Sequence, residues 1–415
     1  MKVTITRLGH LGDGIAETPE GPVFAPRTLP GEVIEGEVLA GRIDAPAIVT
    51  PSPDRVRPPC PHYRTCGGCA LQHASDGFVA RWKAEVVRTA LAAQGLQAPI
   101  GAEHLSPPAS RRRAVLAGRR TKAGAMVGFH ARASETLVDA PDCRVLRPEL
   151  LAVLPALRAA TVLGASRKGE ISFALSATDG GVDVAVSGGR EPDAPLRQSL
   201  AALAETHGFA RLVWNGEPLA LRRPPSQHFG LARVEPPPGA FLQATREGEA
   251  ALLAAVKATV GGASRLADLF AGCGTFALPL ASQAEVHAVE GDPAMVAALL
   301  AGARGVSGLK NVSAEARDLF RRPLLPEELG RFDAVVLDPP RAGAEAQVVE
   351  IGRAAVPLLA YVSCNPVSFA RDARALVAVG YQLDWIELVD QFRWSTHIEL
   401  AARFSLRPRG AASGR

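Results

Sequence analysis

The carboxyl-terminal part of the chain shows a regular alternation of hydrophobic and polar patterns. From residue 262 onward, short apolar runs typical of buried strands alternate with helical patterns such as residues 294–302. The runs expected to form strands are residues 265–269, 285–289, 311–314, 333–337, 358–363 and 382–388. Buried strands that alternate with helices predict a parallel, doubly wound α/β sheet. The last apolar segment, residues 397–404, follows too closely for a helical crossover, so we expect an antiparallel terminal hairpin.

The first 238 residues follow other patterns. Residues 1–50 alternate short β-like runs with glycine-rich turns, which predicts a small β-barrel; such modules often bind nucleic acid, and a packing module is the alternative. Residues 51–59 are proline-rich and typical of an extended linker, and an amphipathic helix is expected at residues 77–94. Strands and helices then mix up to the proline-rich segment 234–238. We therefore expect three domains: a β-barrel (1–50), a mixed α+β central domain (51–238) and the α/β domain (239–408).

The composition of the 415-residue chain excludes a disordered or coiled-coil protein, because 47% of its residues are hydrophobic and 21% are charged. The 46 Lys and Arg residues exceed the 42 Asp and Glu residues by four, a mild excess that permits a polyanionic partner without demanding one. No apolar stretch is long enough for a bilayer, and the amino terminus does not resemble a signal peptide. We expect a cytoplasmic protein that acts as a monomer and not at a membrane.

A glycine-containing loop follows the first strand of the α/β pattern. The segment 268–276 reads Asp-Leu-Phe-Ala-Gly-Cys-Gly-Thr-Phe, and Gly272 and Gly274 would let the backbone approach a ligand. It lacks the third glycine of a dinucleotide fingerprint, while Glu290 closes the second strand where a carboxylate can accept from ribose hydroxyls. The pattern favours S-adenosylmethionine over NAD. Asp318, after the third strand, is a candidate for binding adenine, with an exposed loop carboxylate as the alternative.

The segment Ser363-Cys364-Asn365-Pro366 follows the fifth strand, at the sheet edge where α/β proteins place ligands. Asn365 and Pro366 are expected to begin the next helix, whose positive end would lower the pKa of the Cys364 thiol. An accessible thiolate is a nucleophile; a small buried hydrophobic side chain is the alternative.

The target chemistry is suggested by Asp338-Pro339-Pro340-Arg341. Enzymes that methylate amino groups usually carry a similar tetrad that ends in an aromatic residue, and its replacement by Arg341 favours a carbon target such as uracil C5. A thiolate must add to C6 before C5 can be alkylated, and a base must afterwards remove the C5 proton. Glu399 is our candidate base and His397 the competing one, and the alternative is that both are paired residues inside the terminal hairpin.

Six cysteines in a reducing compartment are better interpreted as metal ligands or catalytic groups than as disulfides. Cys60, Cys66 and Cys69 are closely spaced, and Cys143 lies in a later turn-rich segment. Four thiolates could close one site for either zinc or an iron-sulfur cluster, with an unmetallated structural role as the alternative.

Taken in chain order, the motifs Cys-Pro-x4-Cys-Gly-Gly-Cys, Asp-Leu-Phe-Ala-Gly-Cys-Gly-Thr-Phe, Asp-Pro-Pro-Arg-Ala-Gly, Ser-Cys-Asn-Pro and His-Ile-Glu resemble those of the RNA uracil-5-methyltransferase family. The segment Leu29-Pro30-Gly31-Glu32 resembles the TRAM RNA-binding domain, and the cysteine block resembles the family's 4Fe-4S region. This combination points towards the 23S ribosomal RNA branch. Two departures from the family pattern are Thr245 and the pair Phe392-Arg393.

The resemblance implies a role for each motif residue. Cys364 would be the nucleophile and Glu399 the base. The cofactor pocket or its rim would include Gln243, Phe270, Thr275, Glu290, Asp318 and Asp338. The ligands of a 4Fe-4S cluster would be Cys60, Cys66, Cys69 and Cys143.

The expected partner is RNA, in which the target uridine lies in a loop or is flipped out of its stack. The densest basic run consists of Arg111, Arg112, Arg113, Arg119, Arg120 and Lys122, and it could bind phosphates or form a solvated face. The alternatives to a 23S rRNA target are the T-loop uridine of tRNA, an amino group of a nucleic acid, and a non-catalytic metal-containing RNA-binding protein.

Overall fold

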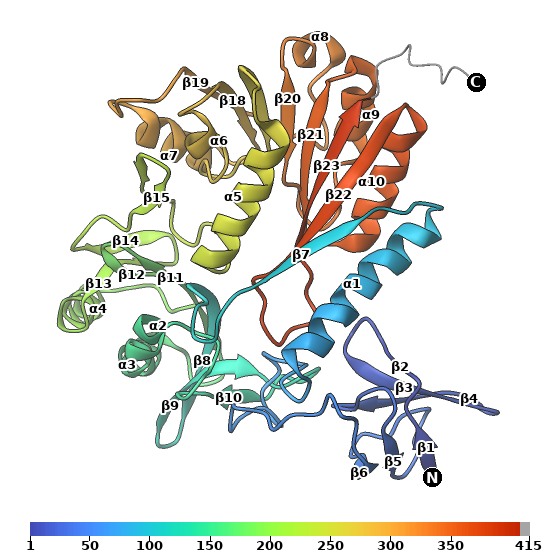
Figure 1. Cartoon of the computed structure of the whole chain (residues 1–415). Coiled ribbons are helices and arrows are strands. Elements are labelled where there is room, and N and C mark those ends of the chain that lie inside the picture. Colours follow the sequence, from blue (N-terminus) through green and yellow to red (C-terminus); the bar gives the residue numbers. More distant parts are fainter. Residues whose placement is uncertain (407–415) are drawn as a thin grey trace.

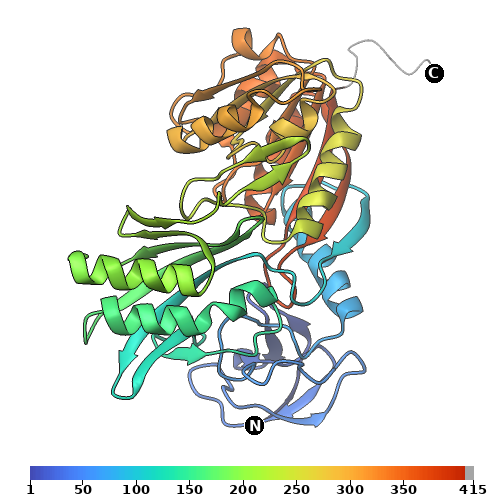
Figure 2. The same cartoon turned by 90° about the vertical axis from the view of Figure 1, so that its left-hand side faces the viewer.

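A computed structural model describes residues 1–406, apart from the side chain of residue 102. The last two residues of the expected α/β domain, 407 and 408, lie outside the described residues. The chain forms three lobes: an amino-terminal β module, a central sheet covered by helices, and a large carboxyl-terminal α/β lobe (Figures 1 and 2). No helix within residues 1–406 combines the length and apolarity that a membrane span requires.

The amino-terminal module contains two small antiparallel sheets, and among the described residues they do not join into one barrel sheet. One sheet consists of β1 (Lys2–Thr4), β5 (Val33–Glu35) and β6 (Ala47–Thr50), and the other of β2 (Arg7–Leu8), β3 (Asp13–Thr18) and β4 (Gly21–Pro26). Buried apolar residues, among them Ile5, Ala25 and Ile34, pack between them.

The central lobe is a seven-stranded sheet in the order β10-β9-β8-β11-β12-β13-β14. Its strands are β8 (Arg113–Thr121), β9 (Gly124–His130), β10 (Leu137–Asp139), β11 (Glu170–Thr178), β12 (Gly181–Ser187), β13 (Phe209–Trp214) and β14 (Glu217–Leu221). Its helices are α2 (Pro148–Ala152), α3 (Leu154–Gly164) and α4 (Ala194–Thr206), and a two-stranded ribbon of β15 (Gln227–Phe229) and β16 (Ala232–Val234) follows. The mixed α+β character expected of this region is confirmed.

The carboxyl-terminal lobe contains an eight-stranded sheet in the order β19-β18-β17-β20-β21-β23-β22-β7. Its strands are β7 (Ile100–Leu105), β17 (Arg265–Leu269), β18 (Glu285–Glu290), β19 (Val312–Ala316), β20 (Ala334–Leu337), β21 (Leu358–Ser363), β22 (Tyr381–Asp390) and β23 (Leu400–Leu406). Its helices are α1 (Asp76–Ala93), α5 (Arg246–Val260), α6 (Ala277–Leu280), α7 (Pro293–Ala303), α8 (Pro326–Leu329), α9 (Glu345–Ala354) and α10 (Pro366–Ala378).

Five strands of this sheet, β17 to β21, are parallel, and both faces of the sheet are buried. Along β20, Val335 and Leu337 belong to the core on one face, whereas Ala334 and Val336 belong to the core on the other. This period of two with apolar residues on both faces explains the continuous hydrophobic runs in the sequence. The doubly wound sheet is therefore confirmed.

The terminal hairpin is also confirmed, with a shifted start. β23 pairs antiparallel with β22 and is inserted between β22 and β21. The strand begins at Leu400 rather than at residue 397, because residues 391–399 form a connecting segment that we call the 391–399 loop.

Residues that precede the central lobe complete the carboxyl-terminal sheet. β7 pairs in parallel with β22 at the sheet edge, and α1 packs beside α10 (Figure 1). The side chain of Ser75 caps α1 by accepting from Phe78 N, and Val87 and Leu91 are buried. Thus part of the segment expected to form the central domain belongs structurally to the sheet of the α/β lobe.

The 391–399 loop is fixed at several points by these earlier segments. At the end of β22, immediately before the loop, Asp390 forms an ion pair with Lys83 of α1 at 2.8 Å, and these side chains are 1% and 2% exposed. The carbonyl of Trp394 accepts from the backbone amides of Ala70 and Leu71, at 2.8 and 2.9 Å. The loop is therefore an anchored connection rather than a free one.

Candidate active site

A cavity of about 620 Å³ opens where β17, β20 and β21 end, the sheet edge at which α/β folds bind ligands. Eight of the predicted site residues line it: Gln243, Phe270, Gly272, Thr275, Glu290, Asp338, Cys364 and Glu399. These residues come from segments separated by more than 150 positions, and the fold brings them to one pocket.

The cofactor loop after β17 is held open towards the cavity. Gly272 has φ +56°, and a Cβ built there would meet no atom within 4 Å, so the backbone borders free space. Gly272 N donates to Glu290 Oε2 at 2.9 Å, and Asp292 N donates to Glu290 Oε1 at 3.0 Å. These bonds fix the carboxylate, whose oxygens keep further lone pairs for hydroxyl donors. The donor and acceptor set fits the ribose of S-adenosylmethionine.

Gly274 and Asp318 have other surroundings and are not among the residues that line the cavity. Gly274 has φ +97°, and a Cβ there would lie 2.7 Å from Leu278, so glycine permits close packing of the loop on α6. Asp318 Oδ1 accepts from Phe320 N at 3.0 Å and thereby stabilises a turn. Phe320 in turn packs against Phe270 with ring centroids 5.4 Å apart.

Buried carboxyl groups concentrate in this pocket. Burial, followed by the charge of Glu290, raises the pKa of Asp338 to about 7. The pKa of Asp268 also lies well above its usual value, because the group is buried and faces Asp338. Clustered carboxyl groups of raised pKa are typical of functional sites.

Cys364 follows β21 and borders the cavity, and its partial exposure argues against a purely hydrophobic role. As predicted, the side chain of Asn365 caps α10 by accepting from Val367 N at 3.1 Å, and Pro366 occupies the first turn. The expected lowering of the thiol pKa is wrong. Burial, together with the charges of Glu399 and Asp338, raises the pKa of Cys364 to about 11 and outweighs the lowering effect of Arg341.

Glu399 ends the 391–399 loop and is 5% exposed. Its Oε2 accepts from Gln391 Nε2 at 3.0 Å. Burial, with the nearby charge of Asp338, raises the pKa of Glu399 to about 8. The group can therefore exchange a proton near neutral pH.

His397 also lines the cavity but is engaged by Arg341, whose Nη2 lies 2.7 Å from His397 Nδ1. A guanidinium can only donate, so Nδ1 is the acceptor and the proton of the neutral ring is on Nε2. Burial and the charge of Arg341 lower the pKa of His397 and favour this neutral ring. Neither ring nitrogen is then free to take a further proton while this contact persists.

Three comparisons with known proteins agree with this geometry. Residues 237–405 match the family model described as tRNA (Uracil-5-)-methyltransferase. An uncharacterized RNA methyltransferase of Brucella suis biovar 1 is 44% identical over 97% of each chain. The 23S rRNA (uracil(1939)-C(5))-methyltransferase RlmD of Halomonas elongata is 37% identical over 96% of this chain and 88% of its own.

The chain belongs to the RNA uracil-5-methyltransferase family. The crystal structure of Pyrococcus abyssi tRNA (uracil-54, C5)-methyltransferase in complex with S-adenosyl-L-homocysteine has the same fold, with a TM-score of 0.76, 21% identity and coverage of 97% of this chain and all of that one. The protein is thus an S-adenosylmethionine-dependent enzyme that methylates C5 of uracil in RNA.

Neighbouring arginines in the basic run of this methyltransferase point in different directions. Arg111 and Arg113 line the cavity, whereas Arg112 is 2% exposed and donates to Gln243 O and Glu249. Arg113 lies over the exposed ring of Phe241, with its guanidinium carbon 4.0 Å from the ring centroid. The alternation follows from the extended backbone, so only Arg111 and Arg113 face the ligand side.

The four cysteines of the expected cluster are free thiols. Burial, and then the charges of the neighbouring cysteines, raises the pKa of Cys69 to about 12 and also raises those of Cys66 and Cys143. Within residues 1–406, however, no group of three or more His, Cys, Asp or Glu side chains is arranged to hold a metal ion. The donor chemistry suits a 4Fe-4S cluster, but the arrangement of the thiols in the described chain does not form a metal site.

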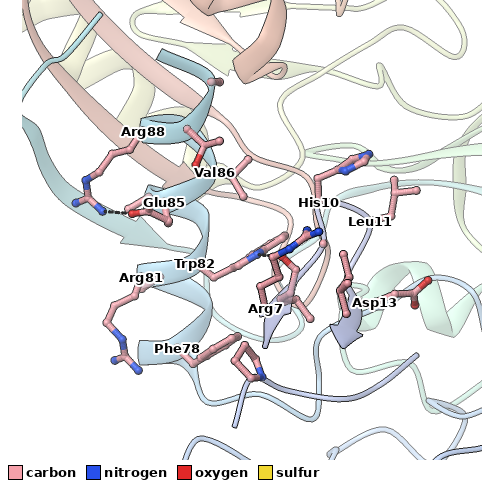
Figure 3. Close-up of a pocket in the computed structure, with 18 of the residues that line it drawn as sticks. Arg7, His10, Leu11, Asp13, Phe78, Arg81, Trp82, Glu85, Val86 and Arg88 are labelled. Carbon is pink, nitrogen blue, oxygen red and sulfur yellow. Dashed lines mark hydrogen bonds and ion pairs between the residues drawn. The ribbon is translucent and has the colours of Figure 1, made fainter. Parts of the chain in front are cut away.

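A second cavity, of about 1450 Å³, lies between the amino-terminal module and α1 of the methyltransferase (Figure 3). Arg7, Arg81 and Arg88 line it, and each forms an ion pair with a carboxylate: Glu17, Asp54 and Glu85, respectively. The charges of these three guanidinium groups are thus offset by neighbouring carboxylates. None of the predicted catalytic residues lies in it.

Two residues of the site carried no signal in the sequence. Met295 lines the cavity from the first turn of α7, and Gln391, which is not among the lining residues, donates a hydrogen bond to Glu399. Neither stands in a motif, and only the folded chain shows their position.

Proposed function

We propose that this enzyme methylates C5 of a specific uridine in 23S ribosomal RNA through a covalent adduct between Cys364 Sγ and C6. The observation that carries the proposal is that Cys364, Glu399 and Glu290 line one cavity at a single sheet edge. The ribosomal target is supported by the 37% identity to RlmD of Halomonas elongata along almost the whole chain. The matching family model is described for tRNA, so the T-loop uridine of tRNA is the second candidate target.

S-adenosylmethionine supplies an electrophilic methyl group when it is bound. Glu290 would orient its ribose, and Asp338 and Phe270 would border the rest of the molecule. Cys364 then has to lose its proton and form the S–C6 bond, which places electron density on C5. Burial and the charges of Glu399 and Asp338 raise the pKa of the Cys364 thiol, so the thiol keeps its proton until the substrate enters. As the S–C6 bond forms, this proton would pass to the Asp338 carboxylate, which leaves Glu399 free for the later step.

After C5 has received the methyl group, Glu399 would take the C5 proton. The electrons of the C5–H bond form the C5=C6 double bond, the S–C6 bond breaks, and the sulfur leaves as thiolate. His397 is the weaker candidate because its Nδ1 accepts from Arg341.

For access to this pocket, the uridine would have to be unstacked. We propose that Arg111 and Arg113 contact the RNA at the cavity mouth and that the amino-terminal module acts as a TRAM-like RNA-binding domain. The 391–399 loop is bonded to the cysteine block through the carbonyl of Trp394 and to α1 through Arg393 and Asp76, which makes these parts neighbours of the substrate site.

The resemblance of the cysteine block to the family's 4Fe-4S region makes a cluster at Cys60, Cys66, Cys69 and Cys143 a separate proposal, although the thiols of the described chain are not arranged as a metal site. Four free thiols from two segments support it, and burial followed by the charges of neighbouring cysteines raises the pKa values of Cys66, Cys69 and Cys143. The test is iron and sulfide analysis of protein purified without oxygen, compared with the Cys143→Ser variant. Absence of iron from the wild-type protein would remove the cluster from the proposal.

The target and the adduct are tested together with labelled S-adenosylmethionine and RNA from a strain that lacks this gene. We expect incorporation into 23S rRNA but not into tRNA. An RNA that contains 5-fluorouridine at the target should become covalently attached to the wild-type enzyme and not to Cys364→Ala. Normal methylation by Cys364→Ala would overturn the adduct, and labelling of tRNA alone would favour the second target.

A further inference from the structure

A side-chain amide links the cofactor side of the cavity to the base. Gln391 Nε2 donates to Gln243 Oε1 at 2.6 Å and to Glu399 Oε2 at 3.0 Å. Gln391 Oε1 accepts from Ala244 N at 2.7 Å. Gln243 Nε2 donates in turn to Asp338 Oδ2 at 3.3 Å. One chain of hydrogen bonds therefore joins the carboxyl groups of Asp338 and Glu399.

The direction of each bond in this chain is determined. A backbone amide can only donate, so the Gln391 atom that faces Ala244 N must be the carbonyl oxygen. The other end of Gln391 is then the NH₂ group, which has two hydrogens for its two acceptors, Gln243 Oε1 and Glu399 Oε2. The orientation of Gln243 follows, with its NH₂ group towards Asp338. All of these groups are satisfied in one arrangement only.

The site is shaped to hold Gln391 closely. Gln391 is 2% exposed, and a Cβ built on Gly248 of α5 would lie 2.6 Å from Gln391 Cβ. On its amino-terminal side, Asp390 is fixed by the ion pair with Lys83 and accepts from Phe392 N through Oδ1, at 3.0 Å. Gln391 thus has no room for another position unless its neighbours move.

We propose that Gln391 is a positioning residue that reserves Oε2 of Glu399 as a hydrogen-bond acceptor and so leaves Oε1 to take the C5 proton of the methylated adduct. This inference rests on the proposed function of Glu399 and goes beyond it, because it assigns the reacting oxygen. Gln391 does not touch the reacting atoms. It acts by holding the Glu399 carboxylate in a fixed position relative to Gln243.

The step that Gln391 controls is the resolution of the adduct. The C5–H bond breaks and its proton forms a bond to Oε1 of Glu399, while the bond electrons form C5=C6 and the S–C6 electrons return to Cys364. Methyl transfer precedes this step and does not require the proton to leave. Loss of Gln391 should therefore slow resolution more than methyl transfer.

The test compares Gln391→Met with Gln347→Met in single-turnover reactions. Methionine has a similar size but lacks the amide. Gln347 is a matched control, since it is 1% exposed and bonds to the backbone of Leu324, outside the cavity. We expect Gln391→Met to slow tritium release from C5 about 10- to 100-fold, the effect of a misplaced catalytic group, while methyl transfer changes less than about threefold. Methylated enzyme–RNA adduct should accumulate on denaturing gels, and Gln347→Met should resolve it normally.

The pH profile of tritium release gives a second readout that a merely structural role would not move. Glu399 faces Asp338, Arg341, Cys364 and Gln391, and among these Gln391 supplies the hydrogen bond that lowers the pKa of Glu399. Its removal should shift the rising limb of the profile to higher pH. Should Gln391→Met fold poorly, Gly248→Ala keeps the amide but displaces it, and a smaller slowing of the same step is expected.

Normal resolution of the adduct and an unshifted profile in Gln391→Met, or equal slowing of both chemical steps, would overturn the assignment and leave the proposed function intact. If the wild-type enzyme forms no adduct at all, the proposed function itself fails, and the two failures are thereby distinguished.

Discussion

Release of the C5 proton should become faster as the pH rises from 7 to 9. Glu399 must be ionised to accept this proton, and its pKa is raised to about 8 by burial and by Asp338. With a pKa near 8, the ionised fraction is about 9% at pH 7 and about 91% at pH 9, so the rate should increase about tenfold. The sign follows from the role of the group, because a base is active when it has lost its proton.

The assay is tritium release from RNA labelled at C5 of the target uridine, followed in a single turnover from preformed adduct. In the adduct the sulfur of Cys364 is a thioether, so the ionisation of this thiol does not enter. Asp338→Asn at saturating S-adenosylmethionine removes a like charge and should move the rising limb to lower pH. Glu387→Gln is the control, since Glu387 pairs with His104 outside the cavity.

A rate that is flat or falls between pH 7 and 9 would refute the assignment of Glu399 as the base. If the rising limb of the pH profile lies at the same pH in Asp338→Asn as in the wild-type enzyme, the electrostatic coupling of Asp338 and Glu399 is refuted. The two results are independent, because the first concerns the identity of the base and the second the cause of its raised pKa.

Three further predictions concern binding and stability. Glu290→Gln should raise the Kd for S-adenosylmethionine about 10- to 100-fold in calorimetry, since charged hydrogen bonds contribute about 1.5–3 kcal/mol; an unchanged Kd would contradict the ribose contact. Lys83→Met leaves the Asp390 carboxylate buried without its partner and should cost about 3–5 kcal/mol in denaturant unfolding, most of which the added change Asp390→Leu should restore. Arg113→Met should weaken RNA binding and reduce its salt dependence without lowering Tm, whereas Arg112→Met should lower Tm; the reverse pattern would contradict the division of the basic run.

Much of the α/β lobe could be predicted because its signals are local. The strand β20 is a continuous apolar run, β21 is apolar up to its final serine, and the cap at Asn365 depends only on the residues beside it. The motifs also supplied eight residues that line one cavity, since the carboxyl ends of parallel strands meet at one edge.

The remaining features depend on contacts between distant residues. The pairing of β7 with β22 joins segments about 280 positions apart, and no periodic pattern encodes it. The raised pKa of Cys364 was missed because it arises from burial and from Glu399 and Asp338, which the sequence does not place beside it. The role of Gln391 was hidden for the same reason: an isolated glutamine carries no signal until its partners are known.

The order of segments in the eight-stranded sheet has a consequence for biosynthesis. A ribosome makes α1 and β7 first, and 276 positions separate Leu105 from Tyr381, the first residue of the strand with which β7 pairs. At about 5–20 residues per second, that interval lasts about 14–55 s. Throughout it, the apolar side of the nascent helix and the open edge of β7 lack their final neighbours. Nascent chains should therefore depend on chaperones during this interval. A carboxyl-terminal fragment that begins at residue 239 lacks α1 and β7, so we expect it to be insoluble.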